Sequence, residues 1–276
     1  GENRLDRNAA SANSNLNFRK AVAHAIDKQL IVDELLAGQL RPLKSFVEMF
    51  APTLSQDSWS QYDYDPEKAR TFAEAAKNDL GVDSLKVVFT STSDSPIRVE
   101  LSELLVEMFS AVGIEYENQL ENSQIFIGES LDFGDWDLGA WAWSSAPGFT
   151  SLIDFFELVD PEQPPPSGSN FYRWGTPEVS RQSIRAFNQG PSSVVDDNTV
   201  RFAEIRDALN ETVDEREIKL LIAEAENILA DQVVFIPLYA RMVTAAVWAD
   251  EIGGFQQNST RAGFTWNIEN WHRVDQ

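Results

Sequence analysis

Strand-like and helix-like segments alternate in the middle of the chain, and this order constrains the fold more than any other feature. The strand-like segments either alternate between apolar and polar residues or are rich in β-branched and aromatic residues. The helix-like segments repeat apolar residues every three or four positions. The expected order is a strand at 85–92, a helix from 95 to a stop at 113, a strand at 114–119, a short helix at 124–133 and a central strand at 137–143. Such alternation is typical of an α/β fold with an at least partly parallel sheet.

A pair of helices is predicted nearer the N-terminus. The first helix has one apolar face at the spacing i, i+4, i+7 and i+8, formed by Phe18, Val22, Ala25 and Ile26. Asp27 is expected to cap the second helix, and Gly38 is expected to end it.

Further elements are expected along the rest of the chain. Asp65 followed by Pro66 is a helix start signal. Other helices are expected at 176–187, 199–210 and 214–230, and strand-like segments at 233–240 and 244–248. A proline-rich stretch from Pro161 to Asn170 is predicted to be an extended surface loop.

The charge balance limits the classes of partner. The chain has 44 acidic against 22 basic residues, a formal net charge of −22. Such a surface repels phosphate backbones and anionic lipids, so nucleic acids and membrane surfaces are not expected partners. No apolar run reaches the ~18 residues of a membrane span. Residues 1–15 lack the apolar core of a signal peptide and are predicted to be a disordered polar lead-in.

Catalytic and metal-binding motifs are missing from the sequence. There is no cysteine, so thiol catalysis, disulfides and thiolate metal sites are excluded. His24 and His272 have no metal-ligand spacing, and no nucleophile, phosphate-binding or dinucleotide-binding motif occurs. We therefore expect no enzyme activity, no metal and no cofactor. The many carboxylates leave a glycosidase pair neither identified nor excluded.

Five segments in a fixed order carry a resemblance to a known family. They are FRKAVAHAIDKQLIVDELLAG (18–38), YDYDPEKARTFAEAA (62–76), AVGIEYE (111–117), DWDLGAWAW (135–143) and ILADQVVFIPLYA (228–240). This succession resembles the extracytoplasmic solute-binding proteins of peptide and nickel ABC importers, family 5, from about residue 16 to 248. The resemblance implies an α/β lobe of the periplasmic-binding-protein type II kind, with a mixed, mainly parallel sheet flanked by helices.

The resemblance also implies a domain organisation. Members of the family carry an export signal and a whole lobe before the segment that begins here near residue 18. We therefore expect a lead-in at 1–15, a second lobe at 16–232 and a return segment at 233–276 that belongs to the first lobe or hinge. Apolar residues of the return segment would then lack part of their partner: Val234, Ile236, Leu238, Val243 and Val247.

The predicted binding site lies at the end of the expected third strand. Trp141 and Trp143 are two residues apart, so both would project from one face at the carboxyl end, where ligands of open α/β sheets gather. Tryptophan offers a large flat surface and one N–H donor. Ser144 and Ser145 would add polar contacts, and Phe149 an apolar one. The alternative is that both tryptophans only pack in the core.

Two further features concern the ligand. Asn170 and Trp174 match a segment that often borders the cleft in the family, although aromatic anchoring of a loop would explain them equally well. In peptide-binding members an aspartate near the strand end pairs with the peptide's amino group. The matching position is close to Ser144, and no acid occurs between Trp141 and Thr150, which puts a peptide with a free amino terminus in doubt.

The resemblance implies the solute-binding component of an ABC importer, located in the periplasm or at the cell surface. Its expected partners are a peptide or peptide-like solute and the permease subunits, with membrane contact only through a lipid anchor of the full-length protein. Nickel chelates, modified sugars and glycolipids stay open as solutes. The alternatives are a carbohydrate-active enzyme or carbohydrate-binding domain, suggested by eight tryptophans and many carboxylates, and a purely structural domain.

Overall fold

A computed structural model describes residues 15–131, 136–143, 148–163, 168–175, 196–240, 246–256 and 263–274. The predicted lead-in, up to residue 14, and the predicted helix at 176–187 lie outside these ranges, as do Ser144 and Ser145.

A parallel three-stranded sheet forms the centre of the α/β part. Strand β1 (Leu85–Thr92) pairs with β2 (Ile114–Glu121) along its whole length and with β3 (Leu138–Gly139) at Phe89 and Thr90. The predicted strand–helix–strand order is confirmed. The prediction that 137–143 is a central strand is wrong, because β3 has two residues and lies at an edge of the described sheet. Beyond this pairing the Ser91 hydroxyl donates to the carbonyl of Ala140 at 2.6 Å.

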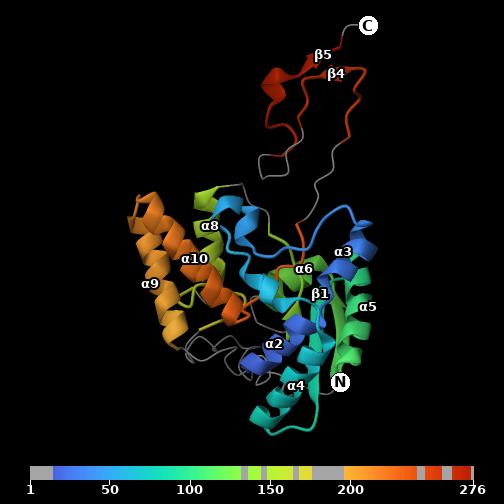
Figure 1. The fold of residues 1–276 in the computed structure, drawn as a ribbon. Coiled ribbons are helices and arrows are strands. Elements are labelled where there is room, and N and C mark those ends of the chain that lie inside the picture. Colours follow the sequence, from blue (N-terminus) through green and yellow to red (C-terminus); the bar gives the residue numbers. More distant parts are fainter. Residues whose placement is uncertain are drawn as a thin grey trace.

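Four helices pack around this sheet, and their caps agree with the sequence. They are α2 (Leu16–Ala25), α3 (Lys28–Leu36), α4 (Pro66–Leu80) and α5 (Pro96–Ala111). The Asp27 carboxylate accepts from Leu30 N at 2.9 Å, and the Asp65 carboxylate accepts from Lys68 N at 3.0 Å. In Figure 1 α2 and α4 lie together and α5 runs alongside β1.

The buried apolar residues of these elements form one cluster, which we call the α/β cluster. Its members include Phe18, Val22, Ile31, Ala73, Val87, Phe89, Leu101, Leu105, Phe109 and Ile114. The apolar face predicted for the first helix lies within it. Beyond β2 the chain forms a short α6 (Ser123–Ile125) and a π-helical turn (Phe126–Ser130), where a short helix was predicted.

A second cluster, which we call the aromatic cluster, lies under three other helices. These are α8 (Phe149–Phe156), α9 (Asp197–Glu211) and α10 (Glu215–Asp231), which stand together on the side of the molecule away from α5 (Figure 1). Three short 3-10 turns (Val47–Met49, Pro52–Leu54 and Ser58–Tyr62) complete it. Its members include Phe46, Phe50, Trp59, Tyr62, Phe155, Phe156, Trp174, Phe202, Ile222 and Leu229.

The segment from 233 to 240 runs between the two clusters. It is extended, but it forms only one bridge, between Tyr239 and Pro42, so the predicted strand is not present. Ile236 packs against both clusters, and Leu238 packs against the α/β cluster. Both side chains stay partly exposed, so the expectation that these residues lack part of their partner remains a prediction. The assignment of 233–276 to another lobe stays a prediction.

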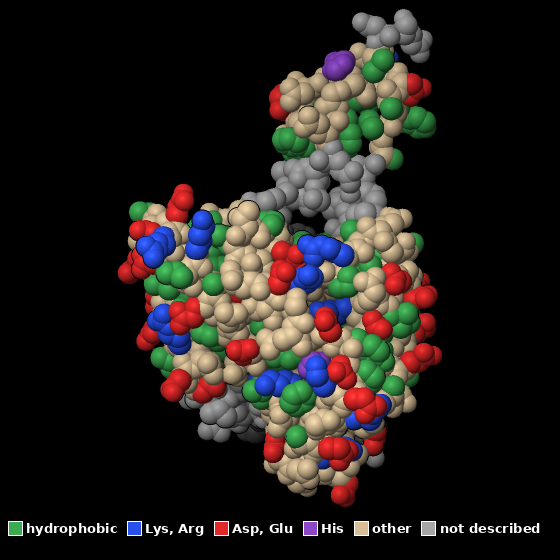
Figure 2. All heavy atoms as spheres, viewed as in Figure 1, with side chains coloured by type: hydrophobic (Ala, Val, Ile, Leu, Met, Phe, Trp, Pro, Cys, Tyr) green, Lys and Arg blue, Asp and Glu red, His purple; other side chains and the backbone are tan. Residues whose placement is uncertain are grey.

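The last part of the chain forms a small unit of its own. Strand β4 (Ile252–Gly253) pairs antiparallel with β5 (His272–Arg273), next to a turn at Ile268–Asn270. Figure 1 shows this unit extending beyond the two clusters, and Figure 2 shows apolar side chains on its surface. Its exposed apolar residues include Trp248, Phe264 and Trp266. The strand predicted at 244–248 is not present at 246–248. Within the described ranges, no helix is both long and apolar enough to cross a membrane.

Candidate ligand-binding site

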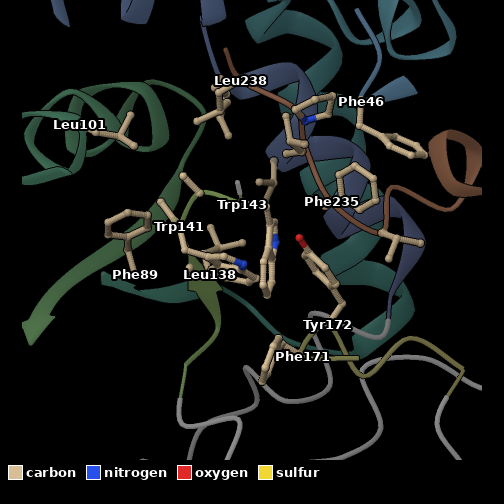
Figure 3. A pocket seen from close by; sticks show the side chains of 18 of the residues that line it. Phe46, Phe89, Leu101, Leu138, Trp141, Trp143, Phe171, Tyr172, Phe235 and Leu238 are labelled. Atoms are coloured by element: carbon tan, nitrogen blue, oxygen red, sulfur yellow. The ribbon is translucent and has the colours of Figure 1, made fainter. Parts of the chain in front are cut away.

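A cavity of about 400 Å³ lies between the two clusters. Five regions of the chain supply most of its wall: α2, residues 43–50, α5, residues 136–143 and residues 233–240. Residues 171–174 complete the wall. Figure 3 shows aromatic and aliphatic side chains around the space, including Phe46, Phe89, Leu138, Phe235 and Leu238. Its volume lies within the range of small-molecule sites, which are mainly apolar with a few polar groups.

Trp143 presents the largest accessible aromatic face at this wall. Its side chain is 42% exposed, and its ring stacks on Phe171 with centroids 5.9 Å apart. Tyr172 is half-buried, and loss of solvent around its hydroxyl raises its pKa well above the usual range. A hydrogen bond with Trp143 opposes that rise. Figure 3 shows the Tyr172 hydroxyl directed at the Trp143 indole, so the orientation of this indole is fixed.

Trp141 lies deeper in the wall. Its ring is 5.3 Å from that of Trp136, edge-on, and 5.3 Å from that of Tyr172. Gly139 makes this packing possible, because a Cβ atom there would lie 2.8 Å from Cζ3 of Trp141. The last residue of β3 must therefore lack a side chain for the indoles to meet.

The charged groups in the wall are held by neighbours. Asp137 accepts from Val88 N at 2.8 Å, and Arg98 donates to the Thr92 hydroxyl at 2.8 Å. Arg19 donates to the Gln232 carbonyl at 2.8 Å, and burial lowers the pKa of Arg19 to about 10. In the described ranges no group of three His, Asp or Glu side chains could hold a metal ion. The chemistry of the wall is therefore aromatic contact supplemented by a few fixed polar groups.

Comparisons with known proteins identify the family of the chain. Residues 6–157, more than half of the chain, match the model of bacterial extracellular solute-binding proteins, family 5 (middle part). The chain belongs to this family. The oligopeptide-binding protein OppA of Bacillus subtilis is 26% identical over 235 residues, which are 82% of this chain and 37% of OppA.

Solved structures of such proteins share the fold. The oligopeptide-binding protein AppA from Bacillus subtilis, in complex with a nonapeptide, has a TM-score of 0.65 at 15% identity over 95% of this chain and 48% of AppA. A mannohexaose-bound periplasmic oligopeptide-binding protein from Thermotoga maritima has a TM-score of 0.66 at 15% identity, over 95% of this chain and 50% of its own. The chain spans half or less of the length of these relatives, and it has the predicted fold of a periplasmic-binding-protein lobe.

The predicted site residues of this family member are found in different places. Trp141, Trp143 and Trp174 line the cavity, although Trp174 is only 3% exposed. Asn170 and Phe149 are not among the lining residues. Phe149 begins α8 and packs against the aromatic cluster. Ser144 and Ser145 lie outside the described residues, and ligand contact by any of these residues stays a prediction.

Asn170 has a structural contact instead. It is fully buried, and its amide donates to the Trp174 carbonyl at 2.9 Å. Between these two residues Arg173 has a φ of 55°, in the left-handed region that non-glycine residues seldom adopt. The Asn170 bond closes this strained turn and so positions Phe171 and Tyr172 at the cavity.

Several wall residues escaped the sequence-based selection. Phe171 and Tyr172 belong to the aromatic segment noted beside Asn170, so the signal was present but was not used. Phe235 and Trp136 lie in two of the segments that carry the family resemblance, but neither segment shows that these side chains line a cavity. Phe235 meets Trp59 across more than 170 positions in the chain, at a ring distance of 5.1 Å. Only the three-dimensional fold brings such residues to one cavity.

Proposed function

We propose that this chain is part of the extracytoplasmic solute-binding component of an ABC importer. It binds a peptide or peptide-like solute in the cavity between the two clusters, and the full-length protein delivers the solute to membrane permease subunits. Membership of family 5 supports the class of protein. The observation that carries the assignment of the site is the exposed Trp143 face, stacked on Phe171 and held by Tyr172 at the mouth of an apolar cavity.

Binding at such a site requires no chemical step. Flat aromatic faces bury the apolar body of a solute, and the few polar groups orient it. Enclosure by a second lobe would remove the solute from water on its other side, as in hinge-closing binding proteins. We therefore propose that the protein is not an enzyme, that it acts outside the cytoplasm, and that a lipid anchor or the permease brings it to the membrane.

Mass spectrometry of molecules that co-purify with the full-length protein would identify the solute. Calorimetry with that solute would then compare the wild type with Trp143→Ala and with Tyr64→Ala. Tyr64 is 44% exposed, much like Trp143, but it does not line the cavity. We expect Trp143→Ala to weaken binding about tenfold or more, since truncated aromatic contacts often dominate a site. Tyr64→Ala should leave affinity unchanged.

Other outcomes would contradict the proposal. Equal affinity of the Trp143→Ala variant would show that the solute binds elsewhere. Hydrolysis of a peptide or glycoside by the pure protein, lost on changing one acid, would favour the enzyme alternative. Because one structural neighbour was solved with mannohexaose, oligosaccharides belong in the ligand panel. Their selective binding would replace the peptide-like solute by a carbohydrate.

A further inference from the structure

Trp136 and Trp141 lie together in one wall of the cavity. Both residues line it, and their rings meet edge-on at 5.3 Å with an interplanar angle of 75°. Both indole nitrogens are buried, and neither has a hydrogen-bond partner among the residues that the structure describes. A buried indole N–H normally finds an acceptor, and leaving it unpaired is unfavourable.

Other tryptophans of the chain differ in this respect. Trp59 donates to the Phe235 carbonyl at 2.9 Å, Trp266 to the Gln256 carbonyl at 3.0 Å, and Trp271 to the Asn267 side chain at 2.9 Å. Trp143 is hydrogen-bonded with Tyr172. The two indoles with unpaired N–H groups therefore both belong to residues of the cavity wall, whereas these other indoles are satisfied by the protein.

Gly139 links the two indoles through the backbone. A Cβ atom at this position would lie 2.8 Å from the Trp141 ring and 3.4 Å from the Trp136 ring. Both rings therefore pack against the backbone of Gly139 at the end of β3. Their close contact limits the motion of each, so the two donors are held in advance of binding.

We propose that Trp136 and Trp141 form a donor pair that recognises amide carbonyl oxygens of the solute. The inference rests on the proposed function and names the ligand chemistry at that same cavity. Indole N–H groups are neutral donors without acceptor capacity. In a mainly apolar wall they suit a neutral carbonyl, whose burial needs a hydrogen bond but no counter-charge. Trp143 supplies a ring face to the solute, and this pair supplies its polar contacts.

The test uses the full-length protein with ¹⁵N-labelled tryptophan and one defined probe, the capped peptide acetyl-Ala-Phe-Ala-amide. This probe is neutral and carries several amide carbonyls. We expect it to move the indole N–H resonances of Trp136 and Trp141 downfield and to slow their hydrogen exchange. The N–H resonance of Trp271, which does not line the cavity, should not move. Calorimetry of the same titration measures affinity independently of these signals.

Two kinds of variant remove the donors. Trp136→Phe and Trp141→Phe should each weaken binding of the probe about tenfold, and Trp271→Phe should leave its affinity within about twofold, since a hydrogen bond lost in a buried site is worth roughly this much. Because a smaller ring can disturb packing, the second kind replaces each tryptophan by β-(3-benzothienyl)alanine, which keeps the shape and lacks the N–H. The same loss with this isostere supports the proposal.

The contradicting outcomes separate the two proposals. Binding of the probe with both N–H resonances unchanged, or with full affinity in the isostere variants, would overturn the donor pair and leave the solute-binding function standing. No heat and no shift of any tryptophan signal at millimolar probe would overturn peptide-like binding at this cavity and the donor pair with it.

Discussion

The α/β cluster and the aromatic cluster are held together in different ways. The α/β cluster consists of periodic helices and a full β1–β2 ladder, which are mostly close to one another in sequence. The aromatic cluster consists of short turns and helices from distant parts of the chain, joined by hydrogen bonds across long sequence separations. The cavity wall takes residues from both. The site therefore depends on two supports of different kinds. The α/β cluster is built from regular helices and strands, and the aromatic cluster is held by a few polar contacts.

Those polar contacts converge on the turns at 52–62. The buried Glu226 carboxylate accepts from Gln56 N at 2.9 Å and from Ser58 N at 3.1 Å. The Trp59 indole donates to the Phe235 carbonyl, and the Tyr62 hydroxyl donates to the Ala230 carbonyl at 3.0 Å. Each bond ties the turns to α10 or to the cavity-lining segment that follows it. Breaking one should loosen the aromatic cluster and leave the α/β cluster intact.

The largest effect is expected at the buried ion pair between Arg206 and Asp160. Asp160 is 1% exposed, burial raises its pKa, and Arg206 opposes that rise. Arg206→Met would leave the carboxylate buried without its partner, which typically costs about 3–5 kcal/mol. Urea unfolding measures this loss in the free energy of unfolding. The loss should shrink as the pH falls, since protonated Asp160 no longer needs the guanidinium.

Arg201→Met is the control for this experiment. Arg201 pairs with Glu224 at 2.7 Å, but both side chains are more than 40% exposed. An exposed pair contributes only about 0–1 kcal/mol. Equal losses in the two variants would show that burial of the Arg206 pair does not matter and that the aromatic cluster does not depend on it.

The next effect concerns Glu226. Glu226→Ala would remove the acceptor of two backbone N–H groups and should cost about 2–3 kcal/mol, since each unsatisfied buried group costs about 1–3 kcal/mol. The same variant should weaken ligand binding, because the turns at 52–62 support Phe235 through Trp59. Thermal unfolding and calorimetry together would measure both effects.

Glu224→Ala is a matched control two positions away on the same helix. Glu224 is exposed and pairs with Arg201, so its removal should cost about 1 kcal/mol or less. A Glu226→Ala variant as stable as Glu224→Ala would contradict the role given to the buried carboxylate.

Tyr62 should make the free energy of unfolding depend on pH, by about 2 kcal/mol. Burial raises its pKa to about 12 from the usual value near 10. The folded state thus favours the neutral phenol, so its stabilising contribution is complete below pH 10 and is lost as the pH rises toward 12. One pKa unit corresponds to about 1.4 kcal/mol, which sets about 2–3 kcal/mol as the upper limit.

The measurement is the free energy of unfolding between pH 10 and 12. The wild type should lose stability more steeply than Tyr62→Phe, which has no phenol to ionise. At neutral pH the variant should be about 1 kcal/mol less stable, because it lacks the bond to Ala230. Parallel slopes in the two proteins would show that Tyr62 is not shielded as described.

The elements that could be predicted from the sequence are those that depend on residues close together in the chain. The helices begin at Asp27 and Asp65 as predicted, because a cap involves residues only three positions apart. The β1–α5–β2 order was predictable for the same reason, since hydrophobic periodicity records which face is buried. The α/β cluster is thus almost fully visible in the sequence.

The rest depends on contacts that no short window contains. The strand predicted at 137–143 is shorter than expected: its pairing with β1 ends at Gly139, and the Ser91 hydroxyl, almost fifty positions earlier, donates to the next carbonyl, that of Ala140. The segment at 233–240 has the residue types of a strand. It packs against side chains of the two clusters and does not pair with another strand of the described residues. Trp141 and Trp143 were selected because they alternate along the chain, but their places in the wall depend on other contacts: Trp141 packs against the bare backbone at Gly139, and Trp143 stacks on Phe171.

The smallest expected effect lies in the α/β cluster. Ile31→Val removes one buried methylene from α3, where Ile31 is fully buried, and should cost about 0.5–1.5 kcal/mol. Ile127→Val is the control, since Ile127 is 54% exposed and should tolerate the change. Because Ile31 does not line the cavity, ligand affinity should be the same in the wild type and both variants. If Ile31→Val weakened binding as strongly as Glu226→Ala, the two clusters would act as one unit, and the contrast between a regular support and a polar-anchored site wall would be wrong.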